Sequence, residues 1–257
     1  MEPRRATIVG LVAALFPVLV IAAAGVQART HAQSERQSQI TREVERRLTD
    51  GRELRRALRD VDVSVQGSEV TLRGTVPNLW AKQEAIGRAL QVEDVVTVAS
   101  ELIITSAESN ETLAQDVMKA IENYPYYTVF DYIGGSITDG VVTLIGYVTP
   151  TPDKKGDIGE RVARVRGVQQ LENQIEILSP SSEDDRLRRA IAAQVFRHAL
   201  FRRFIRNPPF HIIVNRGVVT LVGVVQSGAD KLVMQSIAQG TQGILRVENH
   251  LTTRTGR

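Results

Sequence analysis

The chain has 257 residues and no cysteine, so disulfide bonds, thiolate metal sites and a cysteine nucleophile are excluded. Its hydrophobic fraction of 42% and charged fraction of 24% are ordinary for a globular protein, and its formal net charge is only +3. A chain of this length forms either one large domain or two to three small ones.

The N-terminus has the pattern of a secretory signal peptide over residues 1–28. Basic residues precede an apolar run over residues 8–24, and a small-x-Ala site ends at Ala28. We therefore expect the protein to be exported and cleaved after Ala28. An uncleaved membrane anchor is the alternative, because the apolar run approaches the length of a spanning helix. Residues 29–39 are polar and have no apolar period, which predicts a flexible leader.

A short glycine-flanked pattern occurs three times in the rest of the chain. It reads Gly-Val-Val-Thr-Leu-Ile-Gly at residues 140–146 and recurs at 217–223, and a weaker copy at 68–74 is preceded by Gly67. Such a pattern predicts a tight turn that leads into a short strand. The copies are one small domain apart, which indicates three repeated units. We place these units at residues 40–105, 111–178 and 184–253.

Each unit should begin with an amphipathic helix, because apolar residues recur four positions apart and therefore share one helical face. A strand should follow, paired with the glycine-flanked strand in a hairpin, and then a second helix and a last strand. Gly134 and Gly135 interrupt the first strand of the second unit and suggest a β-bulge there. The periodic helix residues are Ile40, Val44 and Leu48, then Leu113, Val117 and Ile121, then Leu187, Ile191 and Val195.

These patterns predict an α+β protein of three tandem αββαβ units. Alternation of apolar and polar residues along the strands requires one covered face, which two helices per unit can provide. We therefore expect each unit to be a three-stranded mixed sheet covered by two helices. The joints between units are short and polar, so contacts between the repeats are also expected.

The repeat resembles the BON domain (bacterial osmoprotection and nodulation). The matching residues are Gly-Val-Val-Thr-Leu-x-Gly in the hairpin and a later Gly-Val-x-x-Leu/Val-x-Asn-x-Ile/Leu pattern, which fits Gly167 to Ile175 and Gly243 to Leu251. The first unit departs from it, with Asp94 at the turn glycine and Ser100 at the asparagine. The resemblance implies an exported, non-enzymatic protein linked to osmotic stress, envelope integrity or anionic phospholipid.

The sequence contains no recognisable catalytic or metal-binding motif. Its histidines, His31, His198, His211 and His250, are scattered and lack ligand spacing, so they are interpreted as surface or packing residues. Nucleophile elbows, phosphate-binding loops and dinucleotide fingerprints are also missing. We expect no enzymatic activity and no cofactor.

Charge is distributed unevenly among the units. Residues 111–178 hold 6 basic and 10 acidic side chains, a net of −4, whereas residues 184–253 hold 10 and 4, a net of +6. This asymmetry indicates either docking between units or an anionic partner. A nucleic-acid partner is not expected for an exported protein.

The basic residues of the third unit are concentrated between Arg186 and Arg206, which contains seven arginines and no acid. In its later part they alternate with apolar residues, a composition typical of a segment at an anionic phospholipid surface. The alternative is that the apolar residues fold inward and the arginines form a solvated rim. The candidate lipid-binding residues are Arg197, Phe201, Arg202, Arg203, Phe204 and Arg206.

Aromatic residues mark a second candidate surface. Trp80 lies where the second helix of the first unit begins, and Tyr124, Tyr126 and Tyr127 cluster in the second unit. Each is interpreted as a candidate protein contact, because aromatic residues are enriched at interfaces. Two functions therefore remain open: an envelope protein that binds anionic phospholipid or the membrane surface, and a scaffold that pairs with other envelope proteins.

Overall fold

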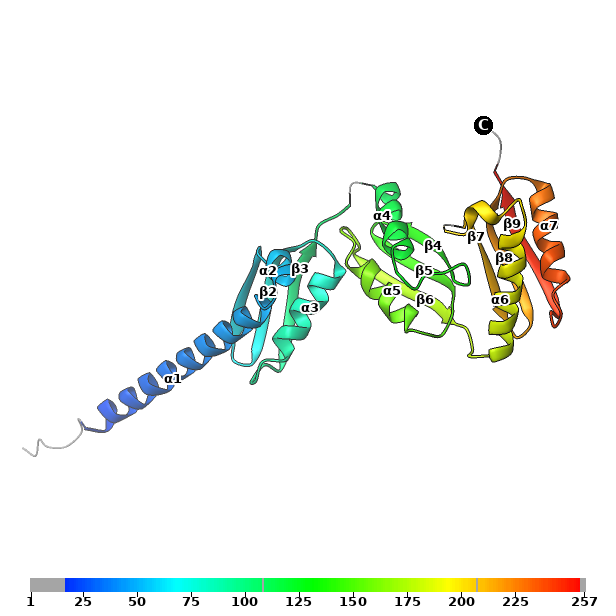
Figure 1. The fold of residues 1–257 in the computed structure, drawn as a ribbon. Coiled ribbons are helices and arrows are strands. Elements are labelled where there is room, and N and C mark those ends of the chain that lie inside the picture. Colours follow the sequence, from blue (N-terminus) through cyan, green and yellow to red (C-terminus); the bar gives the residue numbers. More distant parts are fainter. Residues whose placement is uncertain (1–16, 108, 207, 255–257) are drawn as a thin grey trace, which may run out of the picture. The chain divides into compact units, whose positions relative to one another are not determined.

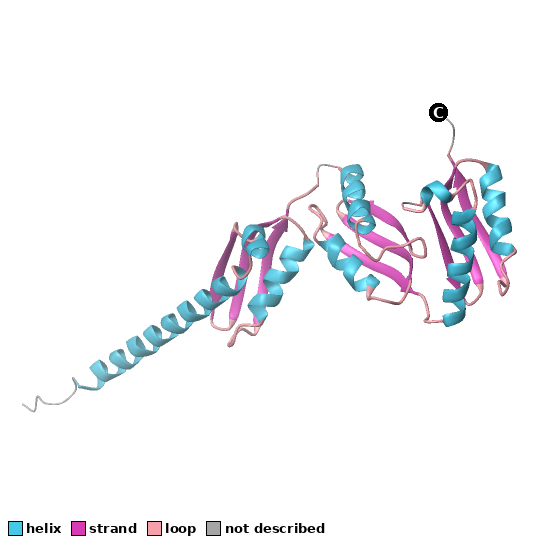
Figure 2. Cartoon of the chain, viewed as in Figure 1, coloured by secondary structure: helices cyan, strands magenta, loops and turns pink. Residues whose placement is uncertain are grey.

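The computed structural model describes residues 17–107, 109–206 and 208–254. Figure 1 shows the order of the elements, and Figure 2 distinguishes helices from strands. The chain forms two compact units: residues 1–74 with 85–101, and residues 75–84 with 102–257.

Three repeats follow one another along the chain. The elements of the first are α1 (Pro17–Leu48), α2 (Arg52–Ala57), β1 (Val61–Gln66), β2 (Glu69–Val76), α3 (Leu79–Leu90) and β3 (Thr97–Ile104). The elements of the second are α4 (Asn110–Glu122), β4 (Tyr132–Thr138), β5 (Val141–Val148), α5 (Lys154–Ala163) and β6 (Gln170–Ile177). The elements of the third are α6 (Ser182–Arg197), the 3₁₀ helix η1 (Arg202–Phe204), β7 (Phe210–Asn215), β8 (Val218–Val225), α7 (Gly228–Gln239) and β9 (Arg246–Thr253).

The predicted αββαβ architecture is confirmed. The three strands of each repeat form a separate sheet, with the glycine-flanked strand β2, β5 or β8 in the middle. This strand pairs antiparallel with the strand before it, and β5 and β8 pair parallel with β6 and β9. The first repeat adds the short helix α2 between its first helix and its sheet.

The periodic residues of the first helices are buried, as the spacing predicts. Leu187, Ile191 and Val195 of α6 are fully buried in the core of the third repeat, together with β7, β8 and α7 residues. The matching residues of α4 lie in the core of the second repeat, and those of α1 are also buried. Serine side chains cap α4, α6 and α7 by accepting a main-chain N–H of the first turn.

The first glycine of each pattern belongs to a two-residue hairpin turn. Asp139 and Gly140 have φ of 49° and 78°, and Arg216 and Gly217 have 51° and 74°. Positive φ at both central residues defines a type I′ turn, whose twist suits a β-hairpin. In the first repeat the positive φ of 63° falls at Gly67, the first central residue, which is typical of type II′. The glycine of the first repeat therefore lies one position earlier because its hairpin turn is of a different type.

The closing glycine is required by a close approach of the neighbouring strand. A Cβ on Gly74, Gly146 or Gly223 would lie 2.0, 2.0 or 2.5 Å from a main-chain oxygen at the start of the first strand of the repeat. No side chain fits at that distance.

Two sequence expectations are wrong. Gly134 and Gly135 form no bulge, because β4 pairs with β5 residue for residue through both. A Cβ on Gly135 would instead lie 1.8 Å from the main-chain oxygen of Thr143, so glycine is needed there for a close approach. Residues 29–39 are not a flexible leader but part of the continuous helix α1. Their Ala, Arg, Gln and Glu residues extend the helix from the packed turns at Ile40 and Val44, which requires no apolar period.

The predicted signal peptide lies largely outside the described residues, because residues 1–16 are not described. In the part that is described, α1 runs through Ala28 without a break. None of the described helices is both long enough and apolar enough to span a bilayer.

Candidate functional site: a basic segment and an aromatic joint

The arginines that follow the core stripe of α6 lie on the surface of the third repeat. We call residues 197–206 the basic segment. Its arginines are exposed, and within the described part of the chain no carboxylate lies at ion-pair distance from any of them. Arg203 places its guanidinium 4.6 Å from the centre of the Phe204 ring. The arginines of the segment are Arg197, Arg202, Arg203 and Arg206.

The aromatic residues of the basic segment point inward, which corrects one of the candidate lipid contacts. Phe201 is fully buried, and its ring contacts Phe210 in the core of the third repeat. Phe204 is partly buried against the same core. The exposed apolar side chains of the segment are instead Leu200, 40% exposed, and Ile205, 64% exposed. The residue spacing in the sequence does not predict which of these side chains are buried, because α6 ends before them and the short 3₁₀ helix η1 does not continue its period.

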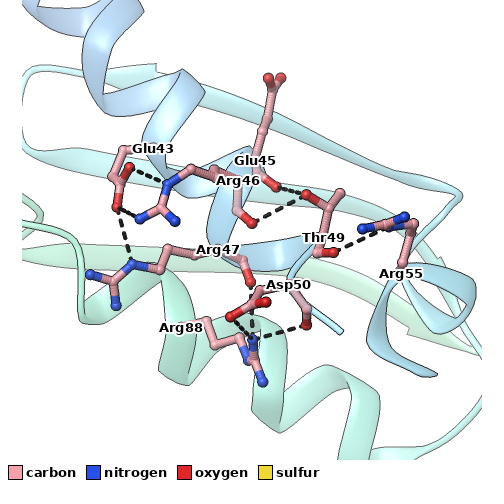
Figure 3. A network of polar contacts seen from close by, with 8 residues as sticks. All are labelled: Glu43, Glu45, Arg46, Arg47, Thr49, Asp50, Arg55 and Arg88. Atoms are coloured by element: carbon pink, nitrogen blue, oxygen red, sulfur yellow. Dashed lines mark hydrogen bonds and ion pairs between the residues drawn. The ribbon is translucent and has the colours of Figure 1, made fainter. Parts of the chain in front are cut away.

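Arginines earlier in the chain have structural roles. At the end of α1, Arg88 of α3 donates to the main-chain oxygens of Arg47 and Asp50, each at 3.2 Å (Figure 3). These are helix-terminal carbonyls, which a cation stabilises. Glu43 accepts hydrogen bonds from Arg46 and Arg47, which lower its pKa to about 2.

Two arginines in the first half of α6 also form specific contacts. Arg188 is buried and donates to Val214 O at 2.6 Å. Arg186 pairs with Glu183. The basic segment therefore differs from these sites in having no such contacts within the described residues.

The tyrosines of the second repeat divide between the core and the surface. Tyr124 is buried, and its hydroxyl donates to Asp157 at 2.5 Å; burial, followed by this contact, raises its pKa to about 12. Tyr126 is 56% exposed. Tyr127 is half-buried, and its hydroxyl oxygen accepts the N–H of Ile133 at 3.3 Å.

The loop after Tyr127 contacts the third repeat. Val129 O accepts the N–H of Ile212 at 2.7 Å, and Val129 and Phe130 pack against the third core. The rings of Tyr127 and Tyr132 lie 5.7 and 5.6 Å from the His211 ring, centre to centre. Tyr127 therefore contributes to a contact between two repeats of the same chain.

His211 was not predicted from the sequence as part of this contact. Its ring is mostly buried, and its Nδ1 has no hydrogen-bond partner among the described residues. Burial lowers its pKa from the ordinary value, and contacts with Asp131 and Thr128 oppose that shift. A histidine in the alternating pattern of β7 carries no signal of its ring partners, which come from another repeat.

A buried ion pair between Asp131 and Lys154 anchors the loop after Tyr127. Asp131 is fully buried and accepts from Lys154 Nζ at 2.6 Å, from Thr128 N at 2.8 Å and from Thr149 N at 2.8 Å. The hydroxyls of both threonines donate to it as well. Both oxygens of the Asp131 carboxylate accept hydrogen bonds, so its buried charge is compensated and the ion pair fixes the position of the loop.

Trp80 also has a contact within its own compact unit. Its ring lies 3.8 Å from the guanidinium carbon of Arg164, and the neighbouring Asn78 donates to Arg164 O at 2.6 Å. The tryptophan is half-buried, so this cation–π contact accounts for part of its surface.

The described residues contain no group of three or more His, Cys, Asp or Glu side chains that could hold a metal ion. The two candidate surfaces are the basic segment, whose arginines have no acidic partner among the described residues, and the aromatic contact between the second and third repeats.

Comparisons with known proteins give the following results. None of the curated proteins compared matches the sequence. Among solved structures, the C-terminal domain of CdsD, a structural protein of the type III secretion system of Chlamydia trachomatis, is similar at 16% identity over 79% of this chain and 95% of that one, with a TM-score of 0.24. A second CdsD structure is similar at 15% identity over 84% and 92%, with a TM-score of 0.25.

The family model gives the decisive result. The BON domain model matches residues 36–106, 109–179 and 184–255, in agreement with the three αββαβ repeats. These matches span most of the chain, and the protein belongs to the BON domain family.

Proposed function

We propose that this protein is a non-enzymatic exported protein of the cell envelope that binds anionic phospholipid surfaces through its third repeat. The observation that carries the proposal is the basic segment, whose exposed arginines have no carboxylate partner among the described residues and lie beside exposed Leu200 and Ile205. Arginine near an anionic leaflet contributes about 1 kcal/mol per charge, and adjacent apolar side chains can enter the interface. Export and envelope association are what membership of the family supports.

The test is co-sedimentation of the mature protein with liposomes that contain or lack anionic lipid. Replacing Arg202, Arg203 and Arg206 together with glutamine should weaken binding to anionic liposomes by about 2–3 kcal/mol. The melting temperature should hardly change, because these side chains have no ion-pair partners among the described residues. Binding should also weaken as salt rises.

A matched control removes the same charge from elsewhere in the repeat. Arg189, Arg216 and Arg254 are exposed arginines outside the basic segment, and their triple glutamine variant should retain most of the binding. Equal losses in the two variants would show that only net charge matters. Wild-type protein that fails to sediment with anionic liposomes would refute the proposal.

A protein-interaction scaffold is the second candidate, and the exposed aromatic residues of the second repeat favour it. Tyr126 is exposed, as are Ile145 and Tyr147 of the central strand β5. Contacts through exposed aromatic and apolar side chains such as these should depend little on salt. Replacing Tyr126 and Tyr147 with serine should reduce recovery of partners after cross-linking in the envelope, without changing liposome binding.

A further inference from the structure

The outer edge of strand β4 presents backbone groups to solvent. Since a two-residue turn joins β4 to β5, their register directs the N–H and C=O groups of Ile133, Gly135 and Ile137 away from β5. Ile133 N–H donates to Tyr127. Across the residues that the structure describes, no segment forms hydrogen bonds with the outward groups of Gly135 and Ile137.

An apolar groove of about 320 Å³ lies between this edge and helix α4. Ala114 and Met118 line it from the helix, and Ile137 and Leu144 line it from the sheet. Gly135, which also lines the groove, contributes no side chain to it.

The third repeat has an isoleucine side chain at the position equivalent to Gly135. Ile212 pairs with Leu221 as Gly135 pairs with Leu144, so the two residues are equivalent. The side chain of Ile212 is fully buried in the third core. The groove of the second repeat is therefore located where its counterpart carries an isoleucine.

The third repeat also shows that this edge accepts another segment of chain. The outward N–H of Ile212 donates to Val129 O at 2.7 Å. Val129 and Phe130, which belong to the second repeat, pack against the third core beside it. One backbone hydrogen bond and two apolar side chains thus occupy the edge that β4 leaves open.

The charge around the groove indicates the kind of segment that fits. Glu111 lines the groove at the first turn of α4. Residues 111–178 hold 10 acidic and 6 basic side chains, a net of −4. A basic segment is therefore favoured over an acidic one.

From these observations we propose that the β4 edge and the groove beneath α4 bind an extended, basic peptide segment of a partner protein. The segment adds to the sheet as a fourth strand by pairing with Gly135 and Ile137, and it inserts one apolar side chain into the groove. Backbone pairing supplies affinity, and the groove and Glu111 supply selectivity for apolar and basic side chains. The groove adjoins the basic segment, because Met118 also lines a second cavity together with Ile205 and Arg206, but the proposed peptide binding does not depend on lipid.

The test uses a fluorescent seven-residue peptide of alternating threonine and isoleucine with a lysine at each end. Anisotropy with the full chain, in the absence of lipid, should show saturable binding. Ala114→Phe fills the groove and should weaken binding at least tenfold, and Glu111→Lys should weaken it several-fold. Gln115→Phe adds the same ring one position away on an exposed part of α4 and should leave binding unchanged.

A second measurement uses the wild-type protein alone and so does not depend on variant folding. The amides of Gly135 and Ile137 should exchange rapidly with deuterium in the free protein and slowly once peptide is bound. A peptide N-methylated along one edge, which cannot pair, should neither bind nor protect these amides. Absence of saturable binding, or binding that Ala114→Phe leaves intact, would overturn the proposal.

Discussion

At the scale of single residues, the glycine that closes each repeat pattern shows how the sequence is constrained by backbone packing. Gly146 has φ of 134°, and a Cβ there would lie 2.0 Å from Tyr132 O. The same contact recurs at Gly74 and Gly223. The sequence shows that a glycine ends the strand, but only the structure shows that the strand before it leaves no room for a side chain.

Gly146→Ala should therefore destabilise the second repeat by more than about 2 kcal/mol, through both the clash and the unfavourable φ. Urea denaturation followed by circular dichroism measures the effect. Gly87→Ala is the control, because no heavy atom beyond its chain neighbours and the local helix backbone lies within 4 Å of a Cβ at that position. It should stabilise the protein by about 0.5–1 kcal/mol. Equal effects of the two substitutions would contradict this account.

The buried ion pair of the second repeat gives another residue-scale prediction. Lys154→Met removes the cation beside the fully buried Asp131 and should cost about 3–5 kcal/mol of the free energy of unfolding. Lys155→Met changes a more exposed neighbour and should cost less than about 0.5 kcal/mol. If the two lysine variants melt at the same temperature, the pair does not hold the loop.

At the scale of elements, periodicity predicts most of the fold. The four-residue spacing in α1, α4 and α6 identifies the buried face of each helix, because burial of one face is what that spacing produces. Residues without a period are predicted less well. Residues 29–39 continue α1 through helix propensity and an exposed ion pair of Arg36 with Asp94, and Phe201 turns inward after α6 has ended. Contacts between repeats, such as those of Tyr127 with His211, leave no periodic signal at all.

His211 of strand β7 should make the contact between the second and third repeats sensitive to pH. Burial holds the pKa of His211 below its ordinary value of 6.5. Below pH 6.5 the histidine is protonated in the unfolded chain but still neutral in the folded chain. The free energy of unfolding therefore decreases as the pH is lowered, until His211 of the folded chain is itself protonated. Thermal melts at pH 7.5 and 5.5 should show this loss.

His211→Phe keeps a ring between the two tyrosines and removes the titration. Its melting temperature should fall less between pH 7.5 and 5.5 than that of the wild-type protein. His250→Phe is the control, because this exposed histidine is on β9 and should leave the pH dependence as it is. An unchanged pH dependence in His211→Phe would assign the effect to other groups.

At the scale of the whole molecule, charge and packing are divided among the repeats. The acidic second repeat and the basic third repeat belong to one compact unit. Among the described residues the contacts between these two repeats are apolar, aromatic and main-chain, and the arginines of the basic segment form no ion pair there. Ion pairs of the basic segment therefore do not contribute to the contact that the described residues form between these repeats.

Because Val129 and Phe130 complete the third core, the second and third repeats should unfold together. In the full chain, hydrogen–deuterium exchange during thermal unfolding should give the same midpoint for peptides from α4 to β6 and from α6 to β9. The Val129→Ser, Phe130→Ser double variant should lower the midpoint of the third repeat first, since it exposes apolar surface of that core. Leu232→Ser with Leu245→Ser removes apolar side chains that are already 67% and 78% exposed and should preserve the common midpoint. Separate midpoints in the wild-type protein would show that the repeats fold independently and that the loop adds little to the third core.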